Sequence, residues 1–404
     1  GLKVIGLAYK KKGTLHDLRD FEWLGLVGMQ DPVRPDVKGA VALCHSAGIK
    51  VKMVTGNHMG TAQKVASAIG LHVKPNQILQ GKDLETMTES DLAKEVNDVL
   101  IFSRVAPHHK LKIVEALQKR GEVAAMIGDG VNDAPALKKA NIGVSVGNAT
   151  DVAQETASLI LLNNSFKTLV STVEEGRIIF DNIRKVVAYV LSNSFAEILT
   201  IFGAMLMNWP PPLSVAQILW IHLICDGPSD IVLGFERGEA GIMDERPKSV
   251  KESILDSWGK SLILVISTVS AAISLFLFWY FWQVYGDARS GSTIVFTVLA
   301  IQELVYIFGY RNLRHSIFKS GNFFKNKALF ATIAFGFFEQ SIALYIPFLN
   351  NALGVVPLHL NDWSIVLVVA FGMLFIVEIV KYVVGYSQRR GKIRHRDELH
   401  ETVV

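Results

Sequence analysis

The sequence has little cysteine, little net charge and no initiating Met. Its two cysteines, Cys44 and Cys225, fall in a soluble-type region and in an apolar helical stretch, so we expect no disulfide framework. The formal net charge of +4 is too small to indicate nucleic-acid binding, and we expect no nucleic-acid partner. The chain opens at Gly1 without an initiating Met or a signal-like segment, so we expect a fragment, or a chain cut from a larger precursor.

Apolar residues are abundant instead. Half of the 404 residues are hydrophobic, and the mean hydropathy of +0.31 is high for a soluble protein. The first part alternates short apolar runs with helical stretches, whereas the later part contains six long apolar stretches. This division predicts an α/β domain of about 170 residues followed by a membrane domain.

The α/β part centres on residues 123–139, VAAMIGDGVNDAPALKK. The run 123–127 predicts a strand, the GDG sequence after it a tight loop, and the following stretch a helix. The two glycines of the loop let the backbone turn sharply and approach a ligand. Asp129 and Asp133 place two carboxylates on this loop, and Mg²⁺ is usually held by such a pair together with water and phosphate.

Strand-like and helical segments alternate around this loop. Strands are predicted at residues 4–8, 23–29, 50–54, 78–79, 100–103, 123–127, 142–146 and 159–162. From residue 36 onward the alternation predicts a parallel sheet covered by helices on both faces. The strand ends then bring Thr55, Lys110 and the two aspartates toward one edge. Lys110 would neutralise a phosphoryl oxygen, and Asn132 would tie the loop or bond the phosphate, which indicates phosphoryl transfer.

Four stretches resemble signatures of the P-type cation-transporting ATPases. They are GDGVNDAPALK within 123–139, MQDPVR at 29–34, MVTGN at 53–57 and FSRVAPHHK at 102–110. The membrane part resembles the calcium-pump branch, type II, so the resemblance covers essentially the whole chain. It implies a haloacid-dehalogenase-like, Rossmann-type phosphorylation domain, with ATP as substrate and Mg²⁺ as cofactor. The family's Asp-Lys-Thr-Gly-Thr segment, which carries the phosphorylated aspartate, is absent from these residues and is expected upstream.

The resemblance also implies roles for individual residues. The phosphate site would be formed by Thr55, Gly56, Asn57, Lys110 and Asn132, the Mg²⁺ site by Asp129 and Asp133, and a hinge pair or nucleotide contact by Asp31 and Arg34. Asn57 departs from the family pattern, which has an aspartate at this position. An amide does not supply the same negative charge to Mg²⁺. Either the site tolerates a neutral group, or the pump is slow or inactive.

Six apolar stretches are predicted to span a membrane, at 186–207, 214–234, 259–284, 291–309, 327–348 and 363–386. Lys and Arg concentrate in two of the loops and in the tail, so the α/β domain and the C-terminus are expected in the cytosol. We expect a multi-pass protein of the plasma or cell membrane, with membrane lipid as a partner. Its parts would be a phosphorylation-domain segment at 1–162, an amphipathic linker at 163–185, six transmembrane helices within 186–386 and a basic tail at 387–404.

Acidic side chains inside these stretches are costly, so each marks a candidate site. Glu197 and Asp226 are the leading candidates for binding the transported cation. For Glu303, ion binding and a polar clamp between helices are equally compatible with the sequence. Glu378 is expected in a structural pair, with Lys381 three residues later as the candidate partner.

The second predicted span carries further candidate ligands. Where the resembling calcium pumps have Asn, Thr and Asp in this helix, the chain has His222, Cys225 and Asp226, and Ser194 replaces an Asn of the preceding helix. His222 and Cys225 are softer groups, better suited to Zn²⁺ or Mn²⁺, unless they only pack. Pro228 removes a backbone donor and predicts a broken helix, whose freed carbonyls could replace a cation's water.

The combined expectation is the C-terminal half of an ATP-driven cation pump, with Ca²⁺ as the leading ion. The alternatives are a pump for another cation (Mn²⁺, Zn²⁺, Na⁺ or K⁺, or H⁺) and a degenerate pump that acts as a non-catalytic membrane scaffold, which Asn57 favours. A phosphatase domain fused to a channel is disfavoured, because carboxylates beside a broken helix fit a gated binding site better than an open pore. The sequence does not indicate whether a regulatory or accessory subunit takes part.

Overall fold

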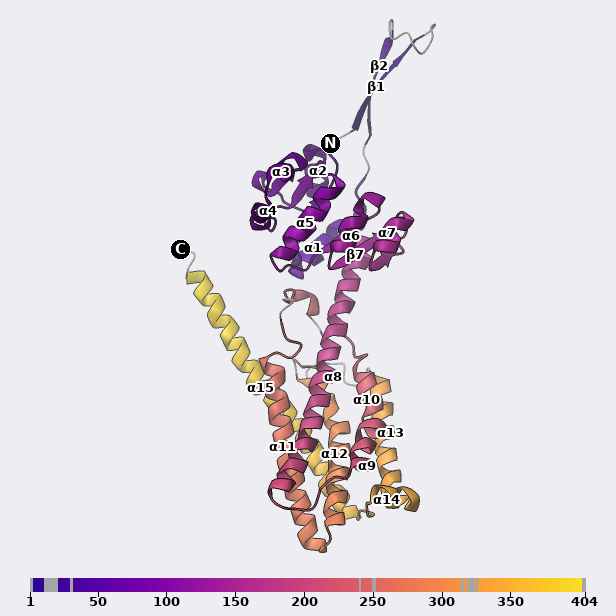
Figure 1. Ribbon diagram of the computed structural model, residues 1–404, viewed down its shortest axis with the longest axis vertical. Helices are drawn as coiled ribbons and strands as arrows, with labels where there is room; N and C mark the ends of the chain where they lie inside the picture. The colour runs from indigo at the N-terminus through magenta and orange to yellow at the C-terminus, as the bar shows by residue number, and fades with distance from the viewer. Residues whose placement is uncertain are drawn as a thin grey trace. The chain divides into compact units, whose positions relative to one another are not determined.

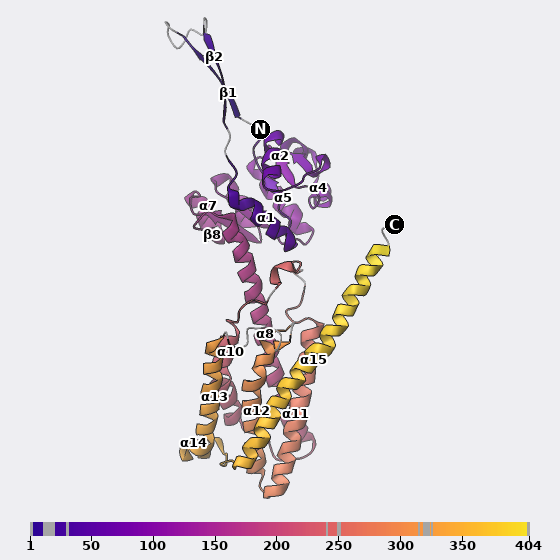
Figure 2. The same ribbon diagram turned by 180° about the vertical axis from the view of Figure 1, so that it is seen from behind.

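The computed structural model describes residues 3–10, 21–29, 32–239, 241–248, 252–313, 316–317, 324 and 326–401, with side chains to residue 383. The chain divides into two compact units. The first contains Gly1–Glu175 and Gly241–Glu252, and the second contains Gly176–Ala240 and Ser253–Val404. Figures 1 and 2 show the two units, each of which is described by itself below.

The first unit begins with an antiparallel hairpin, formed by β1 (Lys3–Tyr9) and β2 (Glu22–Met29) (Figure 1). The two strand-like runs predicted at its position are therefore confirmed. Most described side chains of β2 are exposed, including Trp23 and Leu26.

The remaining strands of this unit form two parallel sheets. The first has the order β3-β5-β4, with β3 at Met53–Val54, β4 at Ile78–Gln80 and β5 at Ile101–Ser103. The second has the order β6-β7-β8, with β6 at Ala125–Gly128, β7 at Ile142–Val146 and β8 at Leu159–Leu161. All four strand pairs are parallel, as predicted, but they form two sheets and not the single sheet that the alternation predicted. Within the described residues, β3 and β6 each have a strand neighbour on one edge.

Short helices follow the strands, as the alternating pattern predicts. They are α1 (Pro35–Ser46), α2 (Met59–Ala68), α3 (Gly81–Thr86), α4 (Glu89–Glu95), α5 (Pro107–Lys119), α6 (Ala134–Lys139) and α7 (Asp151–Thr156). Three 3₁₀ turns, η1 (Pro75–Gln77), η2 (Val131–Asp133) and η4 (Ile242–Asp244), complete the unit.

Helix α5 links the apolar cores of the two sheets. Its Ile113 packs in a cluster with Phe102 of β5, while the adjacent Val114 packs in a second cluster with Met126 of β6. Pro107 at the first helical position lacks the N–H that a helix start leaves unsatisfied, so it favours the start of α5 at this point. Lys110 consequently lies in the first turn of α5, at the helix end that contacts Asp133.

Long apolar helices make up the second unit. In the described chain, five helices are long and apolar enough to cross a membrane: α8 (Phe166–Leu206), α11 (Ser257–Tyr285), α12 (Ala288–Tyr310), α13 (Lys327–Tyr345) and the first part of α15 (Leu360–Glu401) up to Val383. Helix α12 packs against α11, α13 and α15 (Figure 2), and every residue of 293–310 is buried. A short helix, α14 (Pro347–Leu353), precedes α15. The predicted linker 163–185 lies mostly within α8.

The second predicted span is interrupted. Helix α9 (Val215–Trp220) passes into a π turn at Ile221–Cys225 (η3), and α10 (Gly227–Leu233) begins after it. The wider turn is closed by the Asp226 N–H, which donates to the Ile221 carbonyl at 3.0 Å. A Cβ at position 227 would lie 2.9 Å from the His222 carbonyl oxygen, so glycine suits this position. The break predicted beside Pro228 is confirmed, with Pro228 in the first turn of α10.

Two further groups of buried charges in the second unit are paired. Arg311 donates to Glu236 at 2.7 and 3.1 Å, and Asn326 donates to the same carboxylate. Burial alone would raise the pKa of Glu236, but the Arg311 and Asn326 hydrogen bonds outweigh it and leave that pKa lowered. Lys381 forms the expected ion pair with Glu378.

Candidate functional site

The predicted phosphate edge is held together by an ion pair between Lys110 and Asp133. Lys110 comes from α5 and Asp133 from the η2 turn after β6, so the pair joins elements of different sheets. The Asp133 side chain is 7% exposed and that of Lys110 is 18% exposed. The Gly130 N–H donates to the other carboxylate oxygen of Asp133 at 3.4 Å. One carboxylate therefore organises the loop and neutralises the lysine.

Gly128 is needed at the end of β6 because Asp133 packs directly against it. A Cβ at this position would lie 2.5 Å from the Asp133 Cβ and 2.7 Å from its Oδ2 atom. At Gly130 the same Asp133 Oδ2 would be 3.8 Å from an added Cβ, which is an ordinary contact. The two glycines of the GDG loop thus have different roles.

The loop after β3 is fixed mainly by its backbone. The Asn57 N–H donates to Thr55 Oγ1 at 3.1 Å, and the Asn57 carbonyl accepts from the Arg104 N–H at 3.0 Å. The Thr55 carbonyl accepts from the Val105 N–H at 3.2 Å. Gly56 lies between these anchors, and a Cβ there would meet only the Val105 carbonyl, at 3.9 Å. The fixed loop places the Thr55 hydroxyl at the carboxyl end of its strand.

The other predicted residues of this edge are more open. The side chains of Asp129 and Asn132 are exposed, and no hydrogen bond or ion pair is found for either among the described contacts. The Asp129 carbonyl accepts from the Thr150 N–H at 2.9 Å. Asp129 and Asp133 fit Mg²⁺ chemically, because hard oxygen ligands on one loop suit this ion, but Asp133 is bonded to Lys110 instead.

Arg34 makes a structural contact. Its guanidinium donates to the Asn164 carbonyl, and the neighbouring Asp36 accepts from the Ser165 hydroxyl at 2.8 Å. These bonds hold the start of α1 to the segment just before α8. Asp31, the predicted partner of Arg34, lies outside the described residues.

A second polar group lies among the apolar helices. His222 of the π turn is 2.8 Å from Glu197 of α8, measured between Nε2 and Oε2, and its Nδ1 atom is 3.6 Å from Asp226 Oδ2. The Glu197 and Asp226 side chains are 5% and 1% exposed. Because α8 and the interrupted helix supply these residues, the structure brings the two leading carboxylates to one imidazole.

Asn193 and Tyr306 extend this group, and the sequence analysis did not assign a role to either. The Asn193 side chain donates to Asp226 Oδ2 at 3.4 Å, and the Tyr306 hydroxyl donates to the Asn193 side-chain carbonyl. Both are fully buried. The one signal in the sequence was the position of Asn193, one helical turn before Glu197.

The remaining membrane candidates differ in surroundings. Glu303 of α12 is fully buried, and in the described chain neither of its carboxylate oxygens has a hydrogen-bond partner. Cys225 is buried and its thiol donates to Gln340 at 3.5 Å, so it faces α13. Ser194 is half-buried. Asp230, one turn beyond Asp226, also has a buried oxygen without a partner among the described residues.

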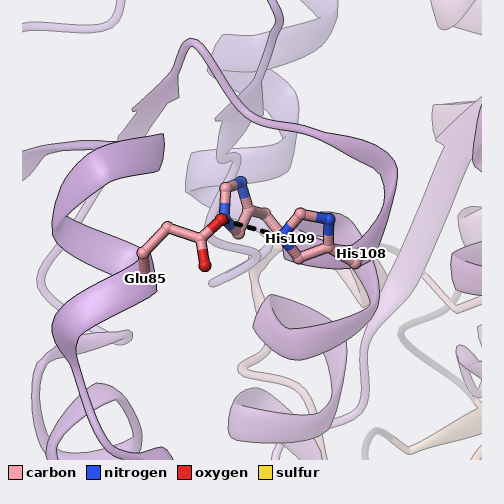
Figure 3. A group of neighbouring side chains, drawn as sticks. All are labelled: Glu85, His108 and His109. Atoms are coloured by element: carbon pink, nitrogen blue, oxygen red, sulfur yellow. Dashed lines mark hydrogen bonds and ion pairs between the residues drawn. The ribbon is translucent and has the colours of Figure 1, made fainter.

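A third group, in the α/β unit, was missed by the sequence analysis. Glu85 of α3 faces His108 and His109 of α5 (Figure 3), with Oε1 at 3.0 and 2.8 Å from their Nε2 atoms. His109 Nδ1 accepts from the Ala106 N–H, so the proton lies on Nε2 and points to Glu85. A metal at that nitrogen would displace this hydrogen bond, and the group therefore acts as a clamp between α3 and α5. The two histidines lie 23 and 24 positions after Glu85, so no local sequence pattern indicates this group.

Comparison with known proteins identifies the family. Residues 210–383 match the family model described as "Cation transporting ATPase, C-terminus", and residues 1–141 match that of the haloacid dehalogenase-like hydrolases. The chain is 36% identical over 402 residues to "Calcium-transporting ATPase 1" of Bacillus cereus, covering 94% of this chain and 45% of that protein. The chain belongs to the P-type cation-transporting ATPases. The predicted family and its calcium-pump-like branch are confirmed.

Other members show the same extent of similarity. "Calcium-transporting ATPase type 2C member 1" of Bos taurus is 36% identical over 395 residues, with 98% of this chain and 40% of that protein covered. "Probable cation-transporting ATPase F" of Mycobacterium bovis is 36% identical over 360 residues, with 87% and 39% covered. The chain thus spans less than half the length of these curated relatives. This P-type ATPase chain is an integral membrane protein, because it has long apolar helices and its relatives are cation-transporting ATPases.

Proposed function

We propose that the protein containing this P-type ATPase chain uses ATP to carry a divalent cation across a membrane through an aspartyl-phosphate intermediate. The observation that carries the proposal is the set of three carboxylates, Glu197, Asp226 and Glu303, buried among apolar helices beside a broken helix. Buried carboxylates without enough cationic partners are costly. A transported cation would supply the missing positive charge.

The phosphoryl step would take place at the edge that holds Lys110. Lys110 would neutralise a phosphoryl oxygen, while Thr55 and the loop amides would donate hydrogen bonds to it. Asp129 and Asp133 would hold Mg²⁺, which when bound supplies further positive charge to the phosphoryl group. Because Lys110 is bonded to Asp133, both groups would exchange partners when phosphate and Mg²⁺ enter together.

The nucleophilic aspartate would lie outside this chain. Among the described residues β3 and β6 each have a strand neighbour on one edge only. This supports the idea, since a further parallel strand pairing with the other edge would end near Thr55 or Asp129. The proposed division is a phosphorylation-domain part at 1–162, a linker at 163–185, a transport domain of six spans within 186–386 and a cytosolic tail. In this division the interrupted α9–α10 segment is the second of the six spans and adds to the five long helices. The protein would lie in the plasma or cell membrane, with its α/β part in the cytosol.

Among divalent cations, Ca²⁺ is the first candidate for the transported ion. It is supported by the names of the relatives from Bacillus cereus and Bos taurus and by the carboxylates, which suit a hard cation. His222 is the main departure from an all-oxygen ligand set.

The test uses the full-length protein in membranes. Phosphoenzyme would be measured from labelled ATP with Ca²⁺, Mn²⁺, Zn²⁺, Na⁺ or K⁺ added singly. We expect phosphoenzyme that depends on a divalent cation and is lost in Asp226→Asn. Asp287→Asn, which changes an exposed carboxylate at the start of α12, is the matched control and should behave as wild type. Cation dependence that survives in Asp226→Asn would remove this residue from the transport site.

A second candidate function is a degenerate pump that acts as a membrane scaffold, and Asn57 favours it. The Asn57 backbone holds its loop, so Asn57→Asp should leave the loop intact while adding a carboxylate. If the pump is active as it stands, turnover should change by less than about tenfold, or about 1.4 kcal/mol. A much larger gain of turnover would support degeneration instead.

A further inference from the structure

His222 occupies an unusual position between the two leading carboxylates. Its ring nitrogens face Glu197 at 2.8 Å and Asp226 at 3.6 Å. In the described chain it is the ion-pair partner of both. The His222 side chain is 32% exposed, whereas those of its two partners are almost completely buried. The imidazole is therefore the most accessible member of the group.

Several buried oxygens without partners lie on the elements that pack around this imidazole. Glu197 Oε1, Asp226 Oδ1 and both carboxylate oxygens of Glu303 are buried, and none has a hydrogen-bond partner among the described residues. Helix α12, which carries Glu303, packs against the π turn that carries His222. Such oxygens need a donor or a cation. In the described chain the ligand atoms of these three carboxylates and the imidazole are not gathered into one compact group, so the side chains would have to close around an ion to bind it.

We propose that His222 is a ligand of the transported cation and that it shifts the selectivity of this site from Ca²⁺ toward imidazole-binding transition-metal dications of the zinc class. This inference rests on the proposed function and refines the choice of ion. Ca²⁺ takes oxygen ligands, whereas imidazole nitrogen is a preferred ligand of zinc and its neighbours. A nitrogen in the shell therefore favours the second class of ion over the first.

The ring geometry suits this role. An ion bound at His222 Nε2 would lie on the side of the ring that faces Glu197. The ring proton would then be on Nδ1, where the N–H faces Asp226. In metal sites a histidine commonly donates its other N–H to a carboxylate, which fixes the ring orientation and raises the basicity of the ligating nitrogen. Asp226 in turn is held by Asn193 and, through it, by Tyr306. The support that a histidine ligand requires is thus already present.

Cys225 does not provide the soft ligand. Its thiol donates to Gln340 Oε1, on the neighbouring α13. The π turn places His222 and Cys225 in the same interrupted segment, yet they face different partners. Selectivity for a zinc-class ion is therefore assigned to the imidazole.

The first measurement is equilibrium binding of ⁶⁵Zn²⁺ and ⁴⁵Ca²⁺ to the full-length protein in membranes. Wild type is compared with His222→Asn and His222→Gln, which keep a polar side chain, and with His359→Asn as the control for an exposed histidine. We expect both His222 variants to lose at least about 10- to 100-fold in Zn²⁺ affinity, because residues that only support a metal ligand already contribute that much. Their Ca²⁺ affinity should be unchanged or higher, and His359→Asn should match wild type.

The second measurement identifies the ligand directly. X-ray absorption at the zinc edge, with one equivalent of Zn²⁺ bound, should show imidazole scattering in wild type and lose it in His222→Asn. His108→Asn and Cys225→Ser are measured in parallel, because a surface histidine group or the thiol could bind Zn²⁺ instead. Loss of zinc binding in either of these variants, with His222→Asn unaffected, would overturn the proposal. An equal gain of affinity for both ions in His222→Asn would also overturn it, because the imidazole would then compete with the cation.

Failure of this inference and failure of the proposed function are distinguishable. Cation-dependent phosphoenzyme with an unchanged Zn²⁺ to Ca²⁺ affinity ratio in both His222 variants would refute the selectivity role and leave the pump. Absence of phosphoenzyme with every cation would refute the pump, and the absorption spectrum would still report whether His222 binds the metal.

Discussion

The Lys110 ammonium and the Asp133 carboxylate form an ion pair that joins the first turn of α5 to the turn after β6. The pair unites a group suited to phosphate with a group suited to Mg²⁺. Lys110 and Asp133 neutralise each other in this arrangement. The affinity for phosphate and the affinity for Mg²⁺ are therefore both reduced until the pair separates. Phosphate and Mg²⁺ arriving together would offset that loss, which makes their binding cooperative.

Lys110→Met tests this exchange. Removing the ammonium frees Asp133, so Mg²⁺ affinity without phosphate should rise by about tenfold, or about 1.4 kcal/mol, while phosphoenzyme falls by at least a similar factor. Calorimetry of Mg²⁺ binding and labelled phosphoenzyme would measure the two effects. The control is Lys112→Met, since Lys112 lies on the same helix and donates to the Leu84 and Met87 carbonyls. An unchanged Mg²⁺ affinity in Lys110→Met would contradict competition within the pair.

The two glycines of the GDG loop give a second prediction. Gly128→Ala should displace Asp133, because the new Cβ would lie 2.5 Å from the Asp133 Cβ. We expect a loss of stability of about 1–3 kcal/mol, as for other overpacked sites, and phosphoenzyme lowered by more than about tenfold. Gly130→Ala is the matched control, because the nearest atom would be 3.8 Å away and the backbone φ of −108° is open to alanine. Similar losses in both variants, by thermal unfolding and labelling, would refute the steric explanation.

Periodicity and turn chemistry predicted the fold where local signals are strong. The predicted strand 142–146 coincides with β7, and the spans at 259–284 and 291–309 lie within α11 and α12. The strand predicted at 50–54 is shorter, since only Met53–Val54 pair with β5. Strand length depends on the packing of side chains against the partner strand, and the local sequence does not contain that information.

Side-chain partners across helices were harder to predict. The sequence located Glu197 and His222, but their contact depends on how α8 faces the π turn. A π turn widens the helix by one residue per turn, so it changes which side chains share a face. For this reason Cys225 faces Gln340, a partner that helical spacing alone does not indicate.

The Glu85 clamp gives a prediction about pH. The pKa of Glu85 lies below its ordinary value. The hydrogen bond from His108 is the largest cause, and the hydrogen bond from His109 is the next largest. A lowered carboxyl pKa means that the contact stabilises the folded state above the ordinary value of about 4.3 and is lost as pH falls through the lower folded value. Hydrogen exchange of the α3 amides, corrected for intrinsic rates, should therefore accelerate as pH falls below about 4.

Glu85→Gln should remove this pH dependence, with exchange in α3 already fast near neutral pH. Glu89→Gln is the control, because Glu89 at the start of α4 pairs with Lys119 at the end of α5, and among the described contacts it has none with the histidines. A pH profile that persists in Glu85→Gln would assign the effect to another carboxyl group.

The last prediction concerns the support of the intramembrane carboxylates. Tyr306→Phe removes the hydroxyl that donates to Asn193, which in turn donates to Asp226. The ring stays buried, so packing is retained while the orientation of Asp226 loosens. We expect cation affinity, measured as the concentration that half-saturates phosphoenzyme formation, to weaken by about 10- to 100-fold, as for other supporting residues of metal shells.

Tyr310→Phe is the matched control for this change. Tyr310 is equally buried on the same helix, but its hydroxyl pairs with Ser192 at 2.7 Å rather than with the Asp226 group. Both variants lose one buried hydroxyl and should lose similar stability, about 1 kcal/mol. Only Tyr306→Phe should weaken the affinity for the transported cation. Equal effects of the two variants on affinity would mean that general packing of α12, and not the Tyr306–Asn193–Asp226 series, holds the carboxylate in place.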